Sequence, residues 1–367
     1  MRYNWQKDDW PNFRFEESAF EADLIAFVEL AGRTTGLLEG ASEDLGAEAV
    51  LDLMIAEAMK SSAIEGEFLS QEDVKSSIRN HLGLNQPSEF VKDERAAGIG
   101  ELLVSVRETF QVELTDEQLF AWHRMLMKGT PEIEAGFWRT GQEPMQVISG
   151  RIDRPTVHFE APPSSEVPQE MNAFLGWFNS SRTAGKSSLS YAPIRSGLAH
   201  LYFESIHPFE DGNGRMGRAI SEKALSQGLG RPALLSLSQT IEANRKAYYQ
   251  ALEDAQQDNE VTDWLCFFVR TILEAQQEAE TRILLAVRKK NYFLRFQDSF
   301  NERQLKAVRR LFEAEPEGFE GGLSAKKYMA ITGTSKATAT RDLQGLTESG
   351  ALRLSGSGRS TRYWLPE

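Results

Sequence analysis

Cysteine is nearly absent from this chain of 367 residues, in which Cys266 stands alone. A single cysteine excludes an internal disulfide and a cysteine-rich zinc site. The neighbours of Cys266 are apolar, so we expect it to lie in the core rather than to act as a nucleophile. Histidine is also scarce, and four of the five histidines show no metal-ligand spacing and are expected to be structural. These four are His81, His123, His158 and His200.

Long apolar runs are missing as well. No stretch approaches the roughly 18 uncharged apolar residues that a membrane-spanning helix needs. The acidic N-terminal region contains tryptophan and lacks the basic and apolar segments of a signal peptide. No G-x-x-x-x-G-K-[ST] phosphate-binding loop occurs, and there is no convincing repeat or low-complexity tract. We therefore expect a cytoplasmic protein that makes no membrane contact.

Positive charge is in short supply over most of the chain. The 41 Lys and Arg residues face 54 Asp and Glu residues, which gives a formal net charge of −13. Residues 321–367 carry seven basic and three acidic residues, or +4, so the remainder carries −17. A strongly acidic body repels nucleic acid, whereas a small basic C-terminal module need not.

The apolar pattern predicts a mainly α-helical protein. Apolar residues recur at i, i+3 and i+4 over most of the chain from about Phe20 onward. Two short stretches, 146–150 and 156–159, flank the polar turn Arg151–Arg154 and predict a small β-hairpin. Helices are expected over 45–59, 91–128, 167–182, 194–205, 215–228, 241–256 and 261–300.

The length of the chain exceeds what one hydrophobic core usually supports, so two or three domains are expected. We place an N-terminal extension and helical region at 1–110, a helical core at 111–300 and a small module at 301–367. The first 35 residues are too aromatic for a disordered tail, and we interpret them as a segment that docks on the main body. Their aromatic residues include Trp5, Trp10, Phe13 and Phe15.

The C-terminal module has the pattern of a winged helix-turn-helix. A linker is expected near 313–318. Helices over 324–332 and 336–349 are joined by the turn Gly333–Ser335, and Gly350 ends the second helix. Two short strands then form a wing around Gly356–Gly358. The candidate phosphate contacts of this module are Lys336, Arg341, Arg353, Arg359 and Arg362.

The most informative stretch is Ile206–Arg218. Its glycines cannot continue a helix and let the backbone approach a ligand closely. A helix follows from Arg215, so the loop lies at a helix N-terminus, which attracts anions. Arg215 and Arg218 share one helix face and can grip neighbouring phosphates. His207 has the side chain best matched to proton abstraction near neutral pH, and Asp211 offers a hard oxygen to Mg²⁺.

Two other interpretations of this stretch compete with an anion-binding site. Gly212–Gly217 formally matches G-x-G-x-x-G, but a dinucleotide-binding fold needs a preceding strand, and the sequence before the loop is helical. Alternatively, a histidine before a proline and an arginine pair at a helix start are often structural when they occur alone. Their combination in one loop-to-helix junction favours function.

Residues His207–Arg218 resemble the signature of the Fic family, H-P-F-x-[DE]-G-N-G-R-x-x-R, and match every specified position. The resemblance covers roughly 115–275 and implies a helical bundle in which the predicted hairpin is a flap beside the site. Fic proteins typically transfer AMP from ATP to a hydroxyl of a target protein. The resemblance therefore implies ATP as substrate, Mg²⁺ as cofactor and a protein partner with a hydroxyl side chain. A homodimer is plausible for the family, although no feature of this sequence indicates one.

The resemblance also implies roles for single residues. His207 would be the general base and Asp211 the Mg²⁺ ligand. Arg215 would contact the β-phosphate and Arg218 the γ-phosphate. The phosphates of the nucleotide would be bound along the backbone of the same segment, formed by Gly212, Asn213, Gly214, Met216 and Gly217.

A second motif lies upstream. Ser61–Gly66 is similar to the inhibitory helix motif of Fic proteins, [ST]-x-x-x-E-[GN]. Gly66 is a plausible C′ residue, which places Glu65 in the last turn of a helix, on the same face as Ser61. By resemblance, Glu65 would pair with Arg218 and deny the γ-phosphate its partner, because a carboxylate and a phosphate compete for one guanidinium.

Weaker similarity concerns the base and the support of the loop. Residues 241–252 resemble the family stretch that lines the nucleotide base, with Asn244 and Tyr249 as contacts. An aromatic pair in a helix is often core instead. His200, one helical stretch before His207, is a candidate support for the site.

Three functions follow as hypotheses. The first is an autoinhibited protein adenylyltransferase. The second is a DNA-binding regulator whose nucleotide site is a sensor, with the C-terminal module on DNA or on a docking protein. The third keeps the fold and changes the reaction to de-AMPylation or transfer of another phosphate-containing group. The target protein and the modified hydroxyl are not specified by any pattern in the sequence.

Overall fold

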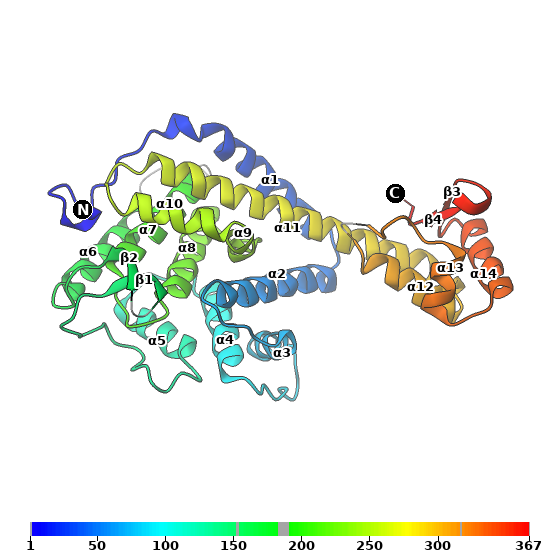
Figure 1. Ribbon diagram of the computed structural model, residues 1–367, viewed down its shortest axis with the longest axis horizontal. Coiled ribbons are helices and arrows are strands. Elements are labelled where there is room, and N and C mark those ends of the chain that lie inside the picture. The colour runs from blue at the N-terminus through cyan, green and yellow to red at the C-terminus, as the bar shows by residue number, and fades with distance from the viewer. Residues whose placement is uncertain (1, 152–153, 183–190, 316–317, 367) are drawn as a thin grey trace. The chain divides into compact units, whose positions relative to one another are not determined.

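The structure, a computed structural model, describes residues 2–151, 154–182, 191–315 and 318–366 (Figure 1). It divides into two compact units. The first consists of Met1–Gly36 and Val50–Ala279, and the second of Leu37–Ala49 and Glu280–Glu367. None of the described helices is long and apolar enough to cross a membrane.

The chain is mainly helical, as the sequence predicts. The helices up to residue 296 are α1 (Glu21–Glu39), α2 (Glu43–Ile64), α3 (Gln71–His81), α4 (Glu94–Glu108), α5 (Asp116–Leu126), α6 (Val167–Ser180), α7 (Tyr191–Ile206), α8 (Asn213–Leu229), α9 (Leu237–Ala243), α10 (Arg245–Ala255) and α11 (Thr262–Phe296).

Two of the predicted helical stretches are interrupted in the structure. The stretch 91–128 contains both α4 and α5, because Thr115 takes an extended conformation and its side chain caps α5 by accepting from the Gln118 N–H. The stretch 241–256 is broken at Asn244, whose backbone leaves the helical region between α9 and α10. Capping and backbone geometry at single polar residues therefore set boundaries that hydrophobic periodicity does not reveal.

The core of the first unit forms around α7 and α8, which pack along one another, while α8 also contacts α4. Phe203 and Ile206 of α7 are fully buried, as are Met216 and Ile220 of α8. Phe209 in the connecting loop is buried in the same cluster. Phe209 therefore anchors the loop between the two helices in the core.

The predicted hairpin is present as β1 (Gln146–Arg151) and β2 (Arg154–Glu160), which pair antiparallel with Gln146 opposite Glu160. Phe159 is buried, whereas Ile148 and Val157 are exposed, so the inner end of the hairpin packs against the body. Of the predicted turn Arg151–Arg154, the two middle residues lie outside the described part of the chain.

The aromatic N-terminal segment docks on the body, as predicted. It contains the short 3-10 helix η1 (Asn4–Gln6), and a second one, η2 (Glu17–Ala19), precedes α1. The Trp10 ring packs edge-on against Tyr202 of α7 at 5.1 Å between centroids.

The expectation that Cys266 is a core residue is wrong, because its side chain is only half-buried on α11, near the Ala19 carbonyl.

The second unit contains α12 (Glu302–Phe312), α13 (Ala325–Thr332), α14 (Lys336–Glu348) and the hairpin β3 (Arg353–Ser355) with β4 (Arg362–Trp364). Two short 3-10 helices, η3 (Gln297–Ser299) and η4 (Gly358–Ser360), complete it. Ser324 and Ser335 cap α13 and α14, and Gly333 turns between them with a φ of 68°.

The core of this unit takes residues from both sides of the linker expected near 313–318. Tyr292 of α11 and Phe312 of α12 lie in one cluster with Tyr328 and Leu343. Pro316 and Glu317, at the centre of that linker, lie outside the described residues. The helix-turn-helix pattern is thus part of a larger helical assembly in which α12 was not predicted.

Candidate functional site

The loop between α7 and α8 has an unusual backbone at both ends. His207, directly after α7, has a φ of 51°, the left-handed region that residues with a side chain rarely adopt. Gly212 directly precedes α8 with a φ of 80°, and a Cβ there would also collide with Met127. Asn213, the first residue of α8, closes the loop on itself. Its side-chain oxygen accepts from the Phe209 N–H at 2.9 Å, and its amide donates to the Phe209 carbonyl at 2.8 Å.

Arg139 fastens the loop from outside the motif. Its guanidinium Nε donates to the His207 carbonyl at 2.8 Å, and its backbone N–H donates to the Pro208 carbonyl at 2.9 Å. A further guanidinium nitrogen donates to Ser164 Oγ at 2.8 Å. The residue is almost fully buried, so these bonds satisfy a cation that would otherwise be costly to bury. The role of Arg139 was not predicted, because no local pattern links it to a loop some 70 residues away.

His123 supports the other side of the loop. Its ring is stacked on Phe209 at 4.0 Å between centroids. Nδ1 accepts from the Gly136 N–H at 2.9 Å, so Nε2 carries the proton and donates to the Asp211 carbonyl at 3.1 Å. Burial lowers the pKa of His123 to about 4, which keeps this ring neutral at pH 7. The expected structural role of His123 thus has a defined partner within the motif.

His207 itself is neutral at physiological pH. Burial, together with the nearby Arg139 cation, lowers its pKa to about 4. The ring nitrogen Nδ1 lies 3.7 Å from Glu204 Oε2, one turn earlier in α7. Burial and the neighbouring Glu65 raise the pKa of Glu204 to about 8, so this carboxyl group is protonated at pH 7. A neutral imidazole is the form that accepts a proton, which suits a general base.

Two glycines in the first two turns of α8 lie close to carboxylates of other elements, which would have to move to admit a side chain. A Cβ at Gly217 would collide with Glu204 Oε1, and a Cβ at Gly214 would collide with Glu65 Oε1. The glycine at N-cap Gly212 has no side chain to cap the helix. The first N–H groups of α8 are therefore available to an anion, and the helix dipole adds to the attraction.

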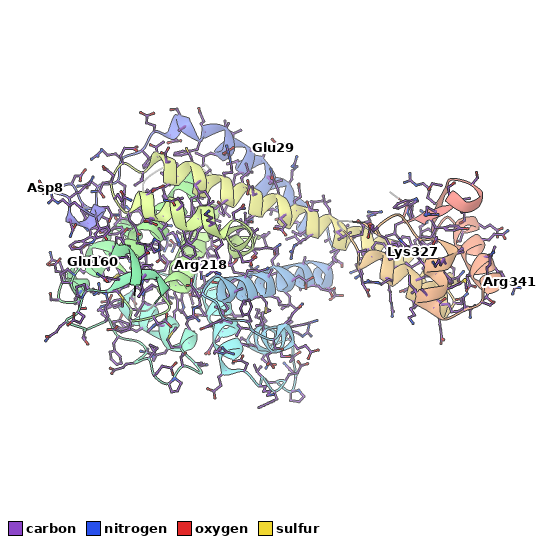
Figure 2. All side chains as sticks on the ribbon, in the orientation of Figure 1. Asp8, Glu29, Glu160, Arg218, Lys327 and Arg341 are labelled. Carbon is purple, nitrogen blue, oxygen red and sulfur yellow. The ribbon has the colours of Figure 1, made fainter. Side chains whose placement is uncertain are left out.

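Arg218 is held in place by the end of α2. Its Nη2 donates to Glu65 Oε1 at 2.9 Å and to the Ser61 carbonyl at 2.9 Å, and its Nε donates to Ser61 Oγ at 2.9 Å. Its side chain is 1% exposed, and Figure 2 labels it inside the first unit. Burial acts to lower the pKa of Arg218, but Glu65 raises it above its usual value. Both residues of the upstream motif therefore contact this arginine.

Arg215 has a carboxylate partner of its own. Its Nη1 donates to Glu67 Oε2 at 2.7 Å, and its side chain is 4% exposed. Glu67 follows Glu65 by two residues, after Gly66 has turned the chain with a φ of 84°. Glu67 was not predicted as a site residue, since only its place next to the upstream motif indicates a role. Each motif arginine is thus paired with a glutamate from the same short segment.

The remaining residues that were expected to contact the nucleotide or to support the site differ in how far they are exposed. Tyr249 is partly exposed, and its hydroxyl lies 3.5 Å from the Ile64 carbonyl, at the end of α2. Asn244 is exposed between α9 and α10, and its side chain donates to the Thr240 carbonyl. The Met216 side chain is buried in the core, so only its backbone can face a ligand. His200 is buried and forms a 2.7 Å hydrogen bond with the neighbouring Tyr248 hydroxyl.

Asp211 is an acidic side chain of the loop that is open to solvent. It is 52% exposed, and Oδ1 accepts from the Gly212 N–H at 2.7 Å while Oδ2 lies 3.7 Å from Arg215. Among the described residues, no group of three or more His, Cys, Asp and Glu side chains could hold a metal ion. One exposed carboxylate beside an anion site fits Mg²⁺, which takes one or two carboxylates and completes its shell with water and phosphate oxygens.

Three parts of the chain match known protein families. Residues 3–84 match a domain of unknown function (DUF4172), and residues 113–225 match the Fic/DOC family. Residues 320–366 match the C-terminal domain of DIP2311-like transcriptional regulators.

Curated relatives are similar at low identity. The chain is 25% identical over 199 residues to protein adenylyltransferase Fic of Nematostella vectensis and 26% identical over 200 residues to protein adenylyltransferase fic-1 of Caenorhabditis elegans. Each match covers 53% of this chain, but only 42% and 35% of those two proteins. The chain therefore spans less than half of the length of these relatives.

Solved structures show the same fold. A Fic family protein from Desulfovibrio desulfuricans has a TM-score of 0.57 at 23% identity, covering 97% of this chain and 98% of that one. A Fic domain containing signaling protein from Bacteroides thetaiotaomicron has a TM-score of 0.52 at 15% identity, covering 71% and 97%. The fold of the solved Fic proteins and the names of the curated relatives agree with the match of residues 113–225 to the Fic/DOC family.

Proposed function

We propose that this protein is an autoinhibited adenylyltransferase, which transfers AMP from ATP to a serine, threonine or tyrosine hydroxyl of a target protein. The observation that carries the proposal is the placement of a neutral, partly buried His207 beside the open N-terminus of α8, whose first turns bear two buried arginines. The names of the curated relatives support the same reaction.

The reaction uses the residues of the loop and of α8. His207 takes the proton of the target hydroxyl, and the oxygen attacks the α-phosphorus of ATP. A new P–O bond forms to the target, the bond between the α-phosphorus and the bridging oxygen breaks, and pyrophosphate leaves. Arg215 and Arg218 stabilise the charge that develops on the leaving phosphates, and backbone N–H groups around Gly212–Gly214 orient the chain of phosphates.

Asp211 is the residue of this loop that would hold Mg²⁺. The ion, when bound with the nucleotide, would neutralise phosphate charge. The exposed position of Asp211 leaves room for the waters that Mg²⁺ retains.

Autoinhibition follows from the two ion pairs at the end of α2. A carboxylate and a phosphate compete for the same guanidinium, so Glu65 on Arg218 opposes the γ-phosphate. Glu67 on Arg215 opposes the next phosphate in the same way. In the resting state ATP therefore binds without its phosphates in the reactive arrangement.

The hairpin β1–β2 would bind the target. Ile148 and Val157 face solvent on it, and the outer edge of a short hairpin can accept an extended peptide as an additional strand. Such pairing would place one hydroxyl of the peptide next to His207. That peptide is a segment of the target protein.

The test is mass spectrometry of a Glu65→Gly variant incubated with Mg²⁺ and each nucleoside triphosphate in turn. We expect AMP on the protein itself, above the level of the wild type, with ATP as the preferred donor. The variant Glu65→Gly/His207→Ala should bind ATP but carry no AMP. Equal labelling of wild type and Glu65→Gly would remove the inhibition proposal, and transfer of a different group would redirect the proposal to another reaction on the same fold.

A second candidate function is DNA binding by the second unit. The family match of residues 320–366 to transcriptional regulators favours it, as does the exposed position of Lys336 and Arg341 on α14. Figure 2 labels Lys327 and Arg341 in this unit. Arg353 is exposed as well, and the Arg359 side chain lies outside the described residues.

One of the predicted phosphate contacts is not available. The Arg362 guanidinium donates to the carbonyls of Gly321 and Thr361, at 2.9 and 2.8 Å, so it supports the fold of the hairpin instead. Binding of duplex DNA by the full chain, measured at several salt concentrations with Arg341→Glu as control, tests the DNA hypothesis. The full chain is required, because the core of this unit begins with Tyr292. Absence of binding at low salt would favour a protein-docking role.

A further inference from the structure

The N-terminal residues around η1 contact the hairpin beside the site. The Trp5 indole N–H donates to the carbonyl of Glu160, the last residue of β2, at 2.8 Å. The Tyr3 ring lies edge-on against Phe159 at 5.0 Å between centroids. Phe159 is 1% exposed, so this ring contact seals the buried end of the strand.

The same N-terminal segment, Tyr3–Gln6, also contacts the end of α7. Asn4 is fully buried, and its amide donates to Ser205 Oγ at 2.9 Å. Its backbone N–H donates to the Gln256 carbonyl at 2.8 Å, and the Gln256 amide donates in turn to the Glu204 carbonyl at 3.2 Å. Ser205 and Glu204 immediately precede the residues that carry the base, His207.

Both contacted elements need external support. A hairpin of two strands is at best marginally stable in water, and its position depends on what its inner face contacts. The last carbonyls of a helix lack partners within the helix, so the end of α7 must be satisfied from elsewhere. Gln256 supplies one such donor to Glu204, and Arg139 supplies another to Ile206.

We propose that Tyr3–Gln6 is a positioning strap, which sets the hairpin β1–β2 and the His207-bearing end of α7 relative to each other. This inference rests on the proposed transfer reaction, since it gives that reaction a common reference for the bound target and the base. It assigns a role to the first residues of the part that matches a domain of unknown function. Tyr3, Asn4 and Trp5 are positioning residues that touch no substrate.

A second tryptophan of the same segment provides a matched control. The Trp10 indole N–H donates to Glu170 of α6 at 2.9 Å, and its ring packs on Phe13 and Tyr202. Trp10 therefore attaches the segment to the body without contacting the hairpin. Trp5→Phe and Trp10→Phe each remove one indole N–H donor and keep an aromatic ring, and the lost hydrogen bond reaches the hairpin in the first variant and the Glu170 carboxylate of α6 in the second.

The test is amide hydrogen exchange of the full chain, followed by mass spectrometry of peptides within 145–161. Loss of one hydrogen bond of average strength should speed the exchange of the hairpin about fivefold in Trp5→Phe. Exchange in Trp10→Phe should stay within about twofold of the wild type. Asn4→Ala should speed exchange in the last turn of α7 instead. Equal hairpin exchange in Trp5→Phe and Trp10→Phe would overturn the proposal.

Activity gives a second readout in the Glu65→Gly background. With ATP labelled at the α-phosphate, Trp5→Phe should lower self-modification by roughly threefold to tenfold while the dissociation constant of ATP, from calorimetry, stays unchanged. A parallel loss of transfer and of ATP affinity would indicate general unfolding and refute a positioning role. If the Glu65→Gly parent transfers no AMP, the proposed reaction fails, and the exchange data still decide whether the strap positions the hairpin.

Discussion

Two buried ion pairs, one in each unit, are built in opposite ways. In the first unit the cation is inside: the Arg218 side chain is 1% exposed and its partner Glu65 is 29% exposed. In the second unit the anion is inside: the Asp342 side chain is 6% exposed and its partner Arg303 is 43% exposed. In each pair the buried group must keep a counter-charge, whereas the exposed group can return to water. The exposed partner is therefore the one that another ion of the same charge can replace.

The hydrogen bonds around the two pairs reinforce this difference. Asp342 accepts from Arg303 at 2.8 Å, from the Tyr328 hydroxyl at 3.0 Å and from the Asn301 amide at 3.1 Å. Burial acts to raise the pKa of Asp342, but these donors lower it below its usual value. Glu65 contacts Arg218 through one oxygen. We infer that the pair in the second unit is structural, whereas the pair at the site can exchange its carboxylate for a phosphate.

Removing the exchangeable charge should have the largest effect. Glu65→Gln retains the shape of the side chain but weakens its hold on Arg218, so transfer of labelled AMP should rise by roughly 10- to 100-fold, the worth of one charged hydrogen bond. The melting temperature of the nucleotide-free protein should fall, because the buried Arg218 loses its counter-charge. Glu72→Gln, an exposed residue of α3, is the control. A loss of stability without a gain of transfer would make this pair structural, like that of the second unit.

Removing the fixed charge should cost stability instead. Asp342→Asn leaves the donors around it without a carboxylate, and the unfolding free energy of the second unit should fall by about 1–3 kcal/mol. Urea denaturation followed by circular dichroism measures this change, with the exposed Glu348→Gln as control. Transfer by the Glu65→Gln variant should be unaffected. An unchanged midpoint would show that the two pairs differ less than their burial suggests.

The second carboxylate at the site should have a smaller effect. Glu67 contacts Arg215 once, and Arg215 retains Asp211 nearby. Glu67→Gln should raise transfer by roughly threefold to tenfold, and more in combination with Glu65→Gln. Initial rates with labelled ATP give both numbers. If the double variant is no faster than Glu65→Gln, then Glu67 does not compete with phosphate.

The last prediction concerns the dependence of stability on pH through Glu204. The folded protein raises the pKa of this carboxyl group to about 8, above its value in the unfolded chain, so its contribution to stability is lost as pH rises toward 8. Glu204→Gln cannot ionise. The stability of this variant relative to the wild type should therefore increase between pH 5 and pH 8, by at most about 1.4 kcal/mol per pH unit. Melting temperatures across this range, with the exposed Glu210→Gln as control, would refute the prediction if the difference is constant.

The sequence predicted the local features of the site. The loop, the helix that follows it and the hairpin were each visible in short stretches, because glycine geometry and hydrophobic period act over a few residues. The contact between Glu65 and Arg218 was expected from a family resemblance and is present in the structure, whereas the contact of Ser61 with the same arginine was not predicted. The boundary at Asn244 was not predicted, since it has no strong local signal. The helix α12 was not predicted either, although the capping box of Asn301 and Gln304 and the amphipathic run after it are local signals.

The sequence alone determined which chemical groups are available: a histidine, a carboxylate, two arginines and a glycine-rich helix start within one loop. Only the tertiary structure decided their state. Burial and Arg139 make His207 neutral, Glu67 occupies Arg215, and residues 3–6 contact both the hairpin and the end of α7. These properties depend on the electrostatic surroundings and on contacts between distant segments, and no local pattern in a chain contains that information.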